Sequence, residues 1–119
     1  MLLVDDDESL AIMTRRQLQA GGFRVTVHTS SLAALDDFRA RPAEFQLLVT
    51  DNSMPRMTGV ALAEEVHRMR PDLPILLVSG LAETADPEEM RSRGIGRLLA
   101  KPHTGRQLRD AVEELIARG

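Results

Sequence analysis

Side chains suited to phosphoryl transfer follow short apolar runs at four places in the chain. They are Asp5–Asp7, Asp51, Ser79 and Lys101. The reaction needs a carboxylate nucleophile, carboxylates for a divalent cation, a hydroxyl donor and an ammonium group, because it depends on positioning and on neutralising the phosphoryl oxygens. The pattern therefore favours a phosphoryl-transfer site, provided that the fold brings the four places together.

The acidic residues predict a Mg²⁺ site. Asp5, Asp6 and Asp51 would repel one another strongly without a counter-ion if they lay close together. Because successive side chains alternate in direction, at most two of the residues 5–7 point into such a site. Two or three carboxylates with room for water suit Mg²⁺, which often binds phosphate as well. The main-chain carbonyl of Ser53 is a further candidate ligand.

Lys101 is the only lysine among the 15 cationic side chains. A lysine ammonium is a compact charge that holds a carboxylate or a phosphoryl oxygen, whereas arginine prefers planar, bidentate partners. Ser79 adds a hydroxyl donor. Taken alone, each feature also has an ordinary explanation as a helix cap, a turn or a solvated charge, but their coincidence favours a site. The histidines show no ligand spacing and are not assigned to it: His28, His103 and His67, which we expect on an exposed helix face.

Five short apolar runs alternate with longer segments that suit helices. The runs are residues 2–4, 23–27, 47–50, 75–78 and 98–100. The clearest helix covers residues 108–116, where apolar residues up to Ile116 recur at intervals of three and four. Apolar faces are also predicted for the first two helices, formed by Leu10, Met13 and Leu18 and by Leu32, Leu35 and Phe38. Successive βα units predict a parallel sheet with helices on both faces.

The composition of the runs predicts the order of the strands. Runs 2–4, 47–50 and 75–78 are apolar almost throughout, as in strands buried on both faces, whereas run 23–27 alternates and suits an edge. An edge position for the second strand favours the order 2-1-3-4-5 of a flavodoxin-like, doubly wound α/β fold. The alternative order, 3-2-1-4-5, would bury that strand. In the favoured order, strands one, three, four and five are neighbours, so the four polar positions converge on one crevice.

Composition places residues 1–119 in a single domain and limits its partners. A chain of 119 residues with 43% hydrophobic and 28% charged residues is ordinary for one globular domain. A net charge of −3, without Trp or Tyr, argues against direct nucleic-acid binding. The absence of cysteine excludes disulfides and thiolate sites. No apolar run is long enough to span a membrane, and the first residues do not form a signal peptide, so we expect a cytoplasmic protein.

Over essentially its whole length the chain resembles the receiver domain of two-component response regulators. The motifs that carry the resemblance are LLVDDDES, LLVTDNSMPRMTG, ILLVSG and LLAKP, in this order and at fitting spacing. The resemblance implies that Asp5 and Asp6 are the Mg²⁺-associated pair and that Asp51 is the phosphorylated residue. It also implies that Ser79 and Lys101 are switch residues.

The resemblance further implies how such a domain acts. Asp51 would receive a phosphoryl group from a phosphohistidine on a sensor histidine kinase or a histidine phosphotransfer domain, with Mg²⁺ bound. The added charge of about −1.5 to −2 would draw Ser79 and Lys101 inward and shift a two-state equilibrium. A downstream protein would bind the face made by the fourth helix, the fifth strand and the fifth helix, and a weak homodimer is a further candidate. The sequence pattern is also similar to that of C-terminal receivers of bacterial hybrid sensor histidine kinases.

The stretch around Lys101 both matches the family and departs from it. The Lys101–Pro102 pair matches a Lys-Pro motif whose peptide bond is often cis, which makes this bond a candidate cis peptide. Three residues before the lysine the family commonly has an aromatic residue, and this chain has Leu98. An aromatic rotamer therefore cannot report movement of Ser79. The residue after Lys-Pro is often Phe in the family and is His103 here.

Two other functions fit part of the pattern. Small Mg²⁺-dependent aspartyl-phosphate phosphatases of the haloacid dehalogenase type also combine an Asp nucleophile, a Ser or Thr and a Lys on a doubly wound sheet. Their usual second Asp, two residues after the nucleophile, is Ser53 in this chain. A degenerate receiver that serves only as a docking module is the other alternative. We expect a phosphoacceptor signalling domain rather than an enzyme.

Overall fold

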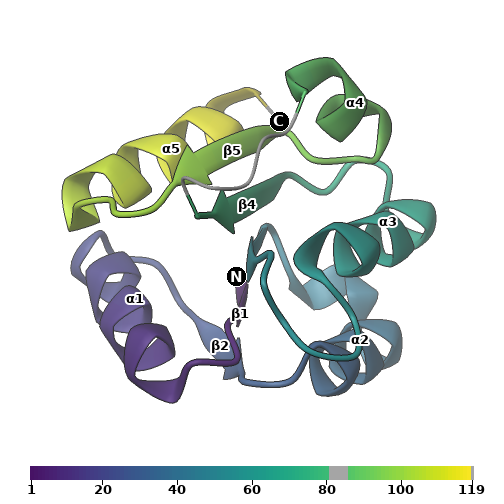
Figure 1. The fold of residues 1–119 in the computed structure, drawn as a ribbon, viewed down its shortest axis with the longest axis horizontal. Coiled ribbons are helices and arrows are strands. Elements are labelled where there is room, and N and C mark those ends of the chain that lie inside the picture. The colour runs from purple at the N-terminus through teal and green to yellow at the C-terminus, as the bar shows by residue number, and fades with distance from the viewer. Residues whose placement is uncertain (81–85, 119) are drawn as a thin grey trace.

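A computed structural model describes residues 1–80 and 86–118, in which strands and helices alternate (Figure 1). The strands are β1 (Leu2–Val4), β2 (Thr26–His28), β3 (Leu48–Asp51), β4 (Ile75–Ser79) and β5 (Arg97–Ala100). The helices are α1 (Glu8–Ala20), α2 (Ser31–Ala40), α3 (Gly59–Met69), α4 (Pro87–Ser92) and α5 (Gly105–Arg118), with a 3-10 turn at Pro42–Glu44.

The strands form one parallel sheet in the order β2-β1-β3-β4-β5. The predicted flavodoxin-like order is therefore confirmed, and the alternative order 3-2-1-4-5 is wrong. The register aligns the carboxyl ends of the strands, because Asp51 pairs with Val78 and Ser79 pairs with Ala100. The last residues of β3, β4 and β5 consequently lie at the same edge of the sheet.

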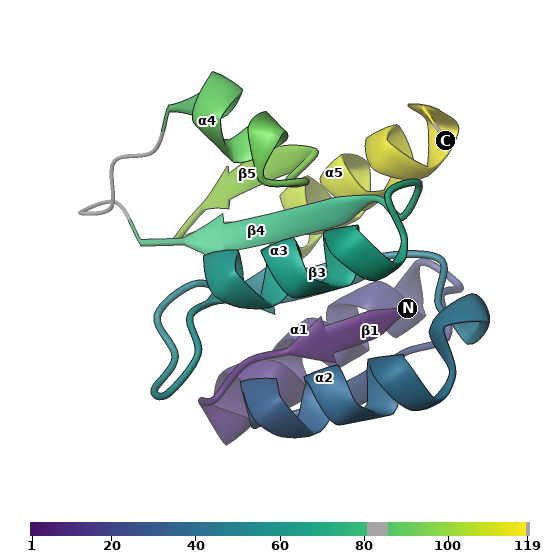
Figure 2. The same ribbon diagram turned by 90° about the vertical axis from the view of Figure 1, so that its right-hand side faces the viewer.

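Helices cover both faces of the sheet. Figures 1 and 2 show α1 and α5 on one face and α2 and α3 on the other, with α4 next to β5. Strands β1, β3 and β4 are fully buried, and their side chains alternate between two apolar cores. Leu2 and Val4 pack in the core beneath α2 and α3, while Leu3 packs in the core beneath α1 and α5. The positions of the site residues thus depend on strands that are held from both sides.

Short polar side chains begin the helices that leave the sheet. Asp7 caps α1 by accepting a hydrogen bond from the Leu10 N–H at 3.1 Å. Thr58 caps α3 in the same way, through the Ala61 N–H at 3.1 Å. Such caps satisfy helix N–H groups that have no partner within the helix. They fix the points at which the chain turns from each strand end into the next helix.

The second strand begins later than predicted. Run 23–27 was expected to be the strand, but β2 covers Thr26–His28 and is only half-buried. Its first residue pairs with Leu2, at the start of β1. The residues before Thr26 run past the beginning of β1 and have no neighbouring strand to pair with. Phe23, Val25 and Val27 still pack against the core beneath α1 and α5, which explains the alternation in the sequence.

The predicted apolar helix faces are only partly right. Leu18 and Phe38 are fully buried, but Met13, Leu32 and Ile116 are exposed. In α1 the buried face is instead formed by Ala11, Thr14 and Leu18. Residues near the end of an apolar stripe lie at the boundary between core and solvent, so spacing alone does not decide their burial.

His67 is not the exposed residue that we predicted. It is half-buried in α3, and its Nδ1 atom is buried and has no hydrogen-bond partner among residues 1–80 and 86–118. The ring packs against Gly94, where a Cβ would lie 2.7 Å from that Nδ1 atom. Contact with the segment that follows α4 therefore covers a side chain that the helical pattern of α3 would leave in solvent.

The longest helix, α5, has 14 residues, and α1 has 13. A helix that spans a bilayer needs about 20 predominantly apolar residues. Within residues 1–80 and 86–118, no helix has the length and apolar character to cross a membrane.

Candidate functional site

The carboxyl edge of the sheet gathers the polar residues that the sequence singled out. Asp51 ends β3 and Ser79 ends β4, and both are buried, with exposed fractions of 6% and 8%. Asp5 follows β1 and is also buried, at 6% exposed. Lys101 follows β5. The four sequence positions therefore meet at one place, because parallel strands end at the same edge.

Asp5, Asp6 and Asp51 form a compact acidic cluster. One carboxylate oxygen from each of the three lies within 4.8 Å of the others. Asp6 is exposed, whereas Asp5 and Asp51 are buried. Asp7 points elsewhere and caps α1. The expectation that at most two of residues 5–7 point into the site agrees with this arrangement.

The Asp5 carboxyl is poorly compensated in its charged form. Burial raises its pKa above the ordinary value, and the nearby charge of Asp51 adds to that increase. The Asp7 N–H, which donates to Oδ1 of Asp5 at 2.9 Å, and the charge of Lys101 act in the opposite direction. The net effect is a raised pKa, so further positive charge at this edge would stabilise the ionised form.

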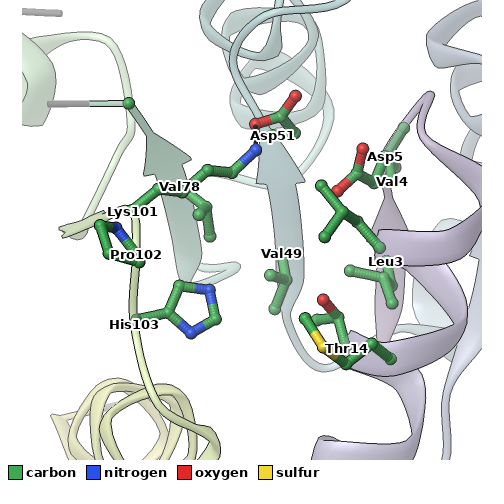
Figure 3. Close-up of a pocket in the computed structure, with 13 residues that line it drawn as sticks. Leu3, Val4, Asp5, Thr14, Val49, Asp51, Val78, Lys101, Pro102 and His103 are labelled. Carbon is green, nitrogen blue, oxygen red and sulfur yellow. Dashed lines mark ion pairs between the residues drawn. The ribbon is translucent and has the colours of Figure 1, made fainter. Parts of the chain in front are cut away.

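Lys101 supplies one positive charge directly to Asp51. Its Nζ lies 2.6 Å from Oδ1 of Asp51 (Figure 3). The Lys101 side chain is one-third exposed, so this ion pair lies at the boundary between the buried strand end and solvent. The backbone N–H of Lys101 donates to the Ser79 carbonyl at 2.7 Å, which ties the end of β5 to the end of β4. The peptide bond between Lys101 and Pro102 is cis.

The loop between β3 and α3 packs tightly behind Asp51. The Asn52 N–H donates to the Val78 carbonyl at 3.0 Å, and the Asn52 carbonyl accepts from the Gly59 N–H at 3.1 Å. A Cβ on Gly59 would contact the Asp51 carbonyl oxygen and would lie 2.9 Å from the Asn52 Cα, so only glycine fits. Arg56 in the same loop has φ of 66°, in the left-handed region that non-glycine residues rarely adopt.

The two remaining predicted site residues are Ser53 and Leu98. Ser53 is exposed in the loop that follows β3, and its role as a carbonyl ligand stays a prediction. Leu98 is half-buried in β5 and packs against the core beneath α2 and α3. An aliphatic side chain therefore occupies the β5 position at which the sequence departs from the family.

Sequence reasoning missed a cavity that opens beside the cluster. Its volume is about 480 Å³, and it lies between α1, the strand ends and the loop after β5. Asp5, Asp51 and Lys101 line one end, and Thr14 and His103 line the walls away from them (Figure 3). No motif marks Thr14, and His103 was set aside for lack of ligand spacing. The departure from Phe after Lys-Pro was the one signal in the sequence that pointed to this wall.

Comparison with known proteins gives the same picture. A sequence profile of the response regulator receiver domain matches residues 1–113. The chain is 30% identical over 118 residues to the sensor kinase CckA of Brucella abortus (strain 2308), covering 99% of this chain and 12% of that protein. It is 29% identical over 116 residues to the response regulator receiver protein CpdR of the same strain, covering 98% of this chain and 95% of that protein.

The fold has a close counterpart among solved structures. A response regulator receiver domain protein from Clostridium thermocellum aligns with a TM-score of 0.91 at 23% identity, covering 98% of this chain and 93% of that chain. Sheet order, helix placement and profile match agree. The chain therefore belongs to the response regulator receiver domain family, the signalling modules of two-component systems.

Proposed function

We propose that this domain accepts a phosphoryl group on Asp51 in a Mg²⁺-dependent reaction and changes conformation as a result. The observation that carries the proposal is the ion pair between Lys101 and Asp51, 2.6 Å long, beside two further carboxylates at the carboxyl edge of a receiver fold. Asp51 is the member of the cluster that combines burial with a direct cationic partner. That ion pair orients the carboxylate, as a nucleophile requires.

The reaction replaces one bond to phosphorus with another. A carboxylate oxygen of Asp51 attacks the phosphorus of a phosphohistidine, the O–P bond forms, and the P–N bond to the departing imidazole breaks. The Lys101 ammonium neutralises charge on the phosphoryl oxygens as they approach. The donor is a sensor histidine kinase or a histidine phosphotransfer domain, a proposal that rests on family membership and on the similarity to a sensor kinase and a receiver protein.

The acidic cluster fits Mg²⁺. Three carboxylate oxygens lie within 4.8 Å of one another. Burial raises the pKa of Asp5, so a bound cation would stabilise its ionised form. Asp5, Asp6 and Asp51, with the Ser53 carbonyl, would hold the ion, and all are the oxygen ligands that Mg²⁺ prefers. When bound, the ion neutralises charge on the transferring phosphoryl group. The residues of this chain then only have to hold the nucleophile and the phosphoryl group in line.

Ser79 and Lys101 form the proposed switch. A phosphoryl group on Asp51 gives both side chains a new anionic partner, and the hydrogen bond from the Lys101 N–H to the Ser79 carbonyl couples their backbones. The response passes to the surface formed by α4, β5 and α5, where a downstream protein binds. Because Leu98 occupies β5, that output proceeds without an aromatic rotamer.

Intact mass spectrometry after incubation with acetyl phosphate and Mg²⁺ tests the proposal. We expect one added phosphoryl group on the parent protein and none on Asp51→Asn. Asp36→Asn is the matched control, because Asp36 is an exposed carboxylate on α2, and it should be labelled like the parent. An adduct that persists in Asp51→Asn would assign the phosphoryl group to another residue.

The same samples separate the two alternatives. An aspartyl-phosphate phosphatase would turn over a generic phosphate ester continuously, whereas a receiver forms one adduct per chain. A docking module would form no adduct and would show no spectral change with beryllofluoride. We expect a single adduct, no sustained ester hydrolysis and a response to beryllofluoride.

The two Brucella relatives differ in how much of them this chain spans, 12% of the sensor kinase and 95% of the receiver protein. We propose that residues 1–119 act as one receiver module in either context. The similarity to the sensor kinase favours a hybrid histidine kinase as a parent protein. Phosphotransfer to the isolated domain from a candidate kinase, compared with transfer from unrelated kinases, tests that context.

A further inference from the structure

We propose that the 480 Å³ cavity beside Asp51 binds a small, uncharged aromatic compound that carries one hydroxyl group. The proposal adds a small-molecule site to the receiver and does not depend on Asp51 being the phosphoacceptor. The floor of the cavity is formed by Leu3, Val49 and Val78, and one wall by Leu10 and Met13 of α1. A volume of this size falls within the range of about 300–1,000 Å³ that is typical of small-molecule sites.

Thr14 places a hydroxyl group on the wall of the cavity. The residue is 8% exposed and lines the cavity. In a helix, a threonine hydroxyl commonly donates to the carbonyl one turn earlier. Within the described residues, no hydrogen bond of the Thr14 hydroxyl is found, in contrast to that of Thr50, which donates to the Asp51 carbonyl. A ligand that bonds to the Thr14 hydroxyl therefore does not have to displace a hydrogen-bond partner within the described residues.

His103 provides a second polar group on the opposite wall. Its Nδ1 lies 3.2 Å from the Thr104 carbonyl, and because a carbonyl only accepts, Nδ1 is the donor in that contact. In the neutral ring Nε2 is then an acceptor. Figure 3 shows the imidazole directed into the cavity, across from Thr14. A ligand hydroxyl both donates and accepts, so it satisfies either side chain.

Without Mg²⁺, the charges around the cavity disfavour an anionic ligand. Asp5 and Asp51 line one end, and the one cation there, Lys101, already pairs with Asp51. An anion would face two carboxylates against one ammonium group. An aromatic ring suits the rest of the lining, because the Met13 thioether favours contact with ring edges and a rigid ring loses little conformational entropy on binding. The ligand class is therefore neutral, aromatic and hydroxylated.

Titration of the full chain with 2-naphthol at pH 7 tests the site. The chain contains no Trp or Tyr, so naphthol fluorescence is read without a protein background. We expect saturable binding with Kd of about 0.1–1 mM. Amide NMR shifts should centre on Thr14, Val49 and His103. The anion 2-naphthoate should bind at least tenfold more weakly.

Three variants test whether 2-naphthol binds in the cavity lined by Thr14 and His103. Thr14→Val keeps the shape and removes the hydroxyl, so we expect binding about fivefold weaker, as the loss of one hydrogen bond predicts. Thr26→Val makes the same change on β2, outside the cavity, and should bind like the parent. His103→Phe places a larger, apolar side chain in the cavity and should abolish binding; it also serves if Thr14→Val does not fold.

Three results would overturn the proposal. They are the absence of saturable binding to the parent, equal affinity of the parent and both cavity variants, and NMR shifts centred on another cavity. Labelling of Asp51 by acetyl phosphate is a separate measurement, so failure here leaves the proposed phosphoacceptor function intact.

Discussion

Gly59 and Gly94 lie in two parts of the domain that are held in different ways. Gly59 opens α3 behind Asp51, and a side chain there would strike the backbone of Asp51 and Asn52. Gly94 follows α4 with φ of 93°, and a side chain there would strike the ring of His67. The first glycine is enclosed by main chain and the second by a side chain.

The difference indicates which region can adapt. The main chain behind Asp51 is fixed by two buried strands and cannot shift without moving the carboxylate. Near α4, the contacts are made by side chains: the His67 ring, and Arg93, which pairs with Glu64 of α3 and with Glu89 of α4. Side chains can adopt other rotamers at small cost. The region around α4 can therefore be repositioned while the site around Asp51 stays intact.

Gly59→Ala should have the largest effect. We expect a loss of about 3 kcal/mol in the free energy of unfolding, because a methyl group would overlap backbone that has no room to move. Labelling by acetyl phosphate should slow as well, since Asp51 would be displaced. Urea denaturation measures the first effect. Gly80→Ala is the matched control, because its Cβ would meet nothing within 4 Å, and it should change stability by less than about 0.5 kcal/mol.

Gly94→Ala should lower the free energy of unfolding by less, about 2 kcal/mol. About 1 kcal/mol of this loss arises from placing alanine at positive φ. The remainder comes from the contact with His67, and a side chain can be removed. In a His67→Gly background, which removes the His67 Cβ as well as the ring, the same substitution should therefore cost only about 1 kcal/mol. A double-mutant cycle by urea denaturation gives this difference. Equal losses of unfolding free energy in both backgrounds would show that the region around α4 is as rigid as the site around Asp51.

Arg93→Gln removes two ion pairs, one with Glu64 of α3 and one with Glu89 of α4. All three side chains are at least one-third exposed, so we expect a loss of about 0.5 kcal/mol, smaller still in high salt. Arg106→Gln is the control, because Arg106 is 86% exposed and its ion pair is 4.0 Å long. A loss from Arg93→Gln as large as that from Gly94→Ala would mean that charge, rather than packing, holds α4.

Arg56→Gly should have the smallest effect, and it should stabilise the domain. The left-handed backbone at Arg56 is strained for any residue with a Cβ, whereas glycine adopts it freely but gains entropy in the unfolded chain. We expect a net gain of about 0.3 kcal/mol in the free energy of unfolding, measured by thermal or urea denaturation. Arg56→Ala keeps the strain and should bring no gain, which separates backbone relief from the loss of the guanidinium group.

The strand order and the convergence of the site could be predicted because they depend on burial patterns that span whole strands. Fully apolar runs identified the central strands, and polar residues at their ends then met by topology. Asp5, Asp51, Ser79 and Lys101 come together for that reason. The start of β2 could not be predicted in this way, because it depends on where its neighbour β1 begins.

Contacts between distant segments account for the remaining misses. His67 looks exposed on a helical pattern, but the segment after α4 covers it. No motif marks Thr14, yet it lines the open cavity together with His103, 89 residues later in the chain. Such contacts depend on how helices and loops approach one another across the sheet, and no local period records that approach.

The single lysine of the chain has a practical consequence. Its ammonium group is the only side-chain amine, and it lies against the carboxylate proposed to be phosphorylated. Reductive methylation with ¹³C-formaldehyde would therefore attach isotope-labelled methyl groups at this one position and at the N-terminal amine alone. The lysine signal would then follow the ion pair with Asp51 directly through metal binding, phosphorylation and ligand exchange. The domain thus offers a spectroscopic probe at the centre of its own site without any engineered residue.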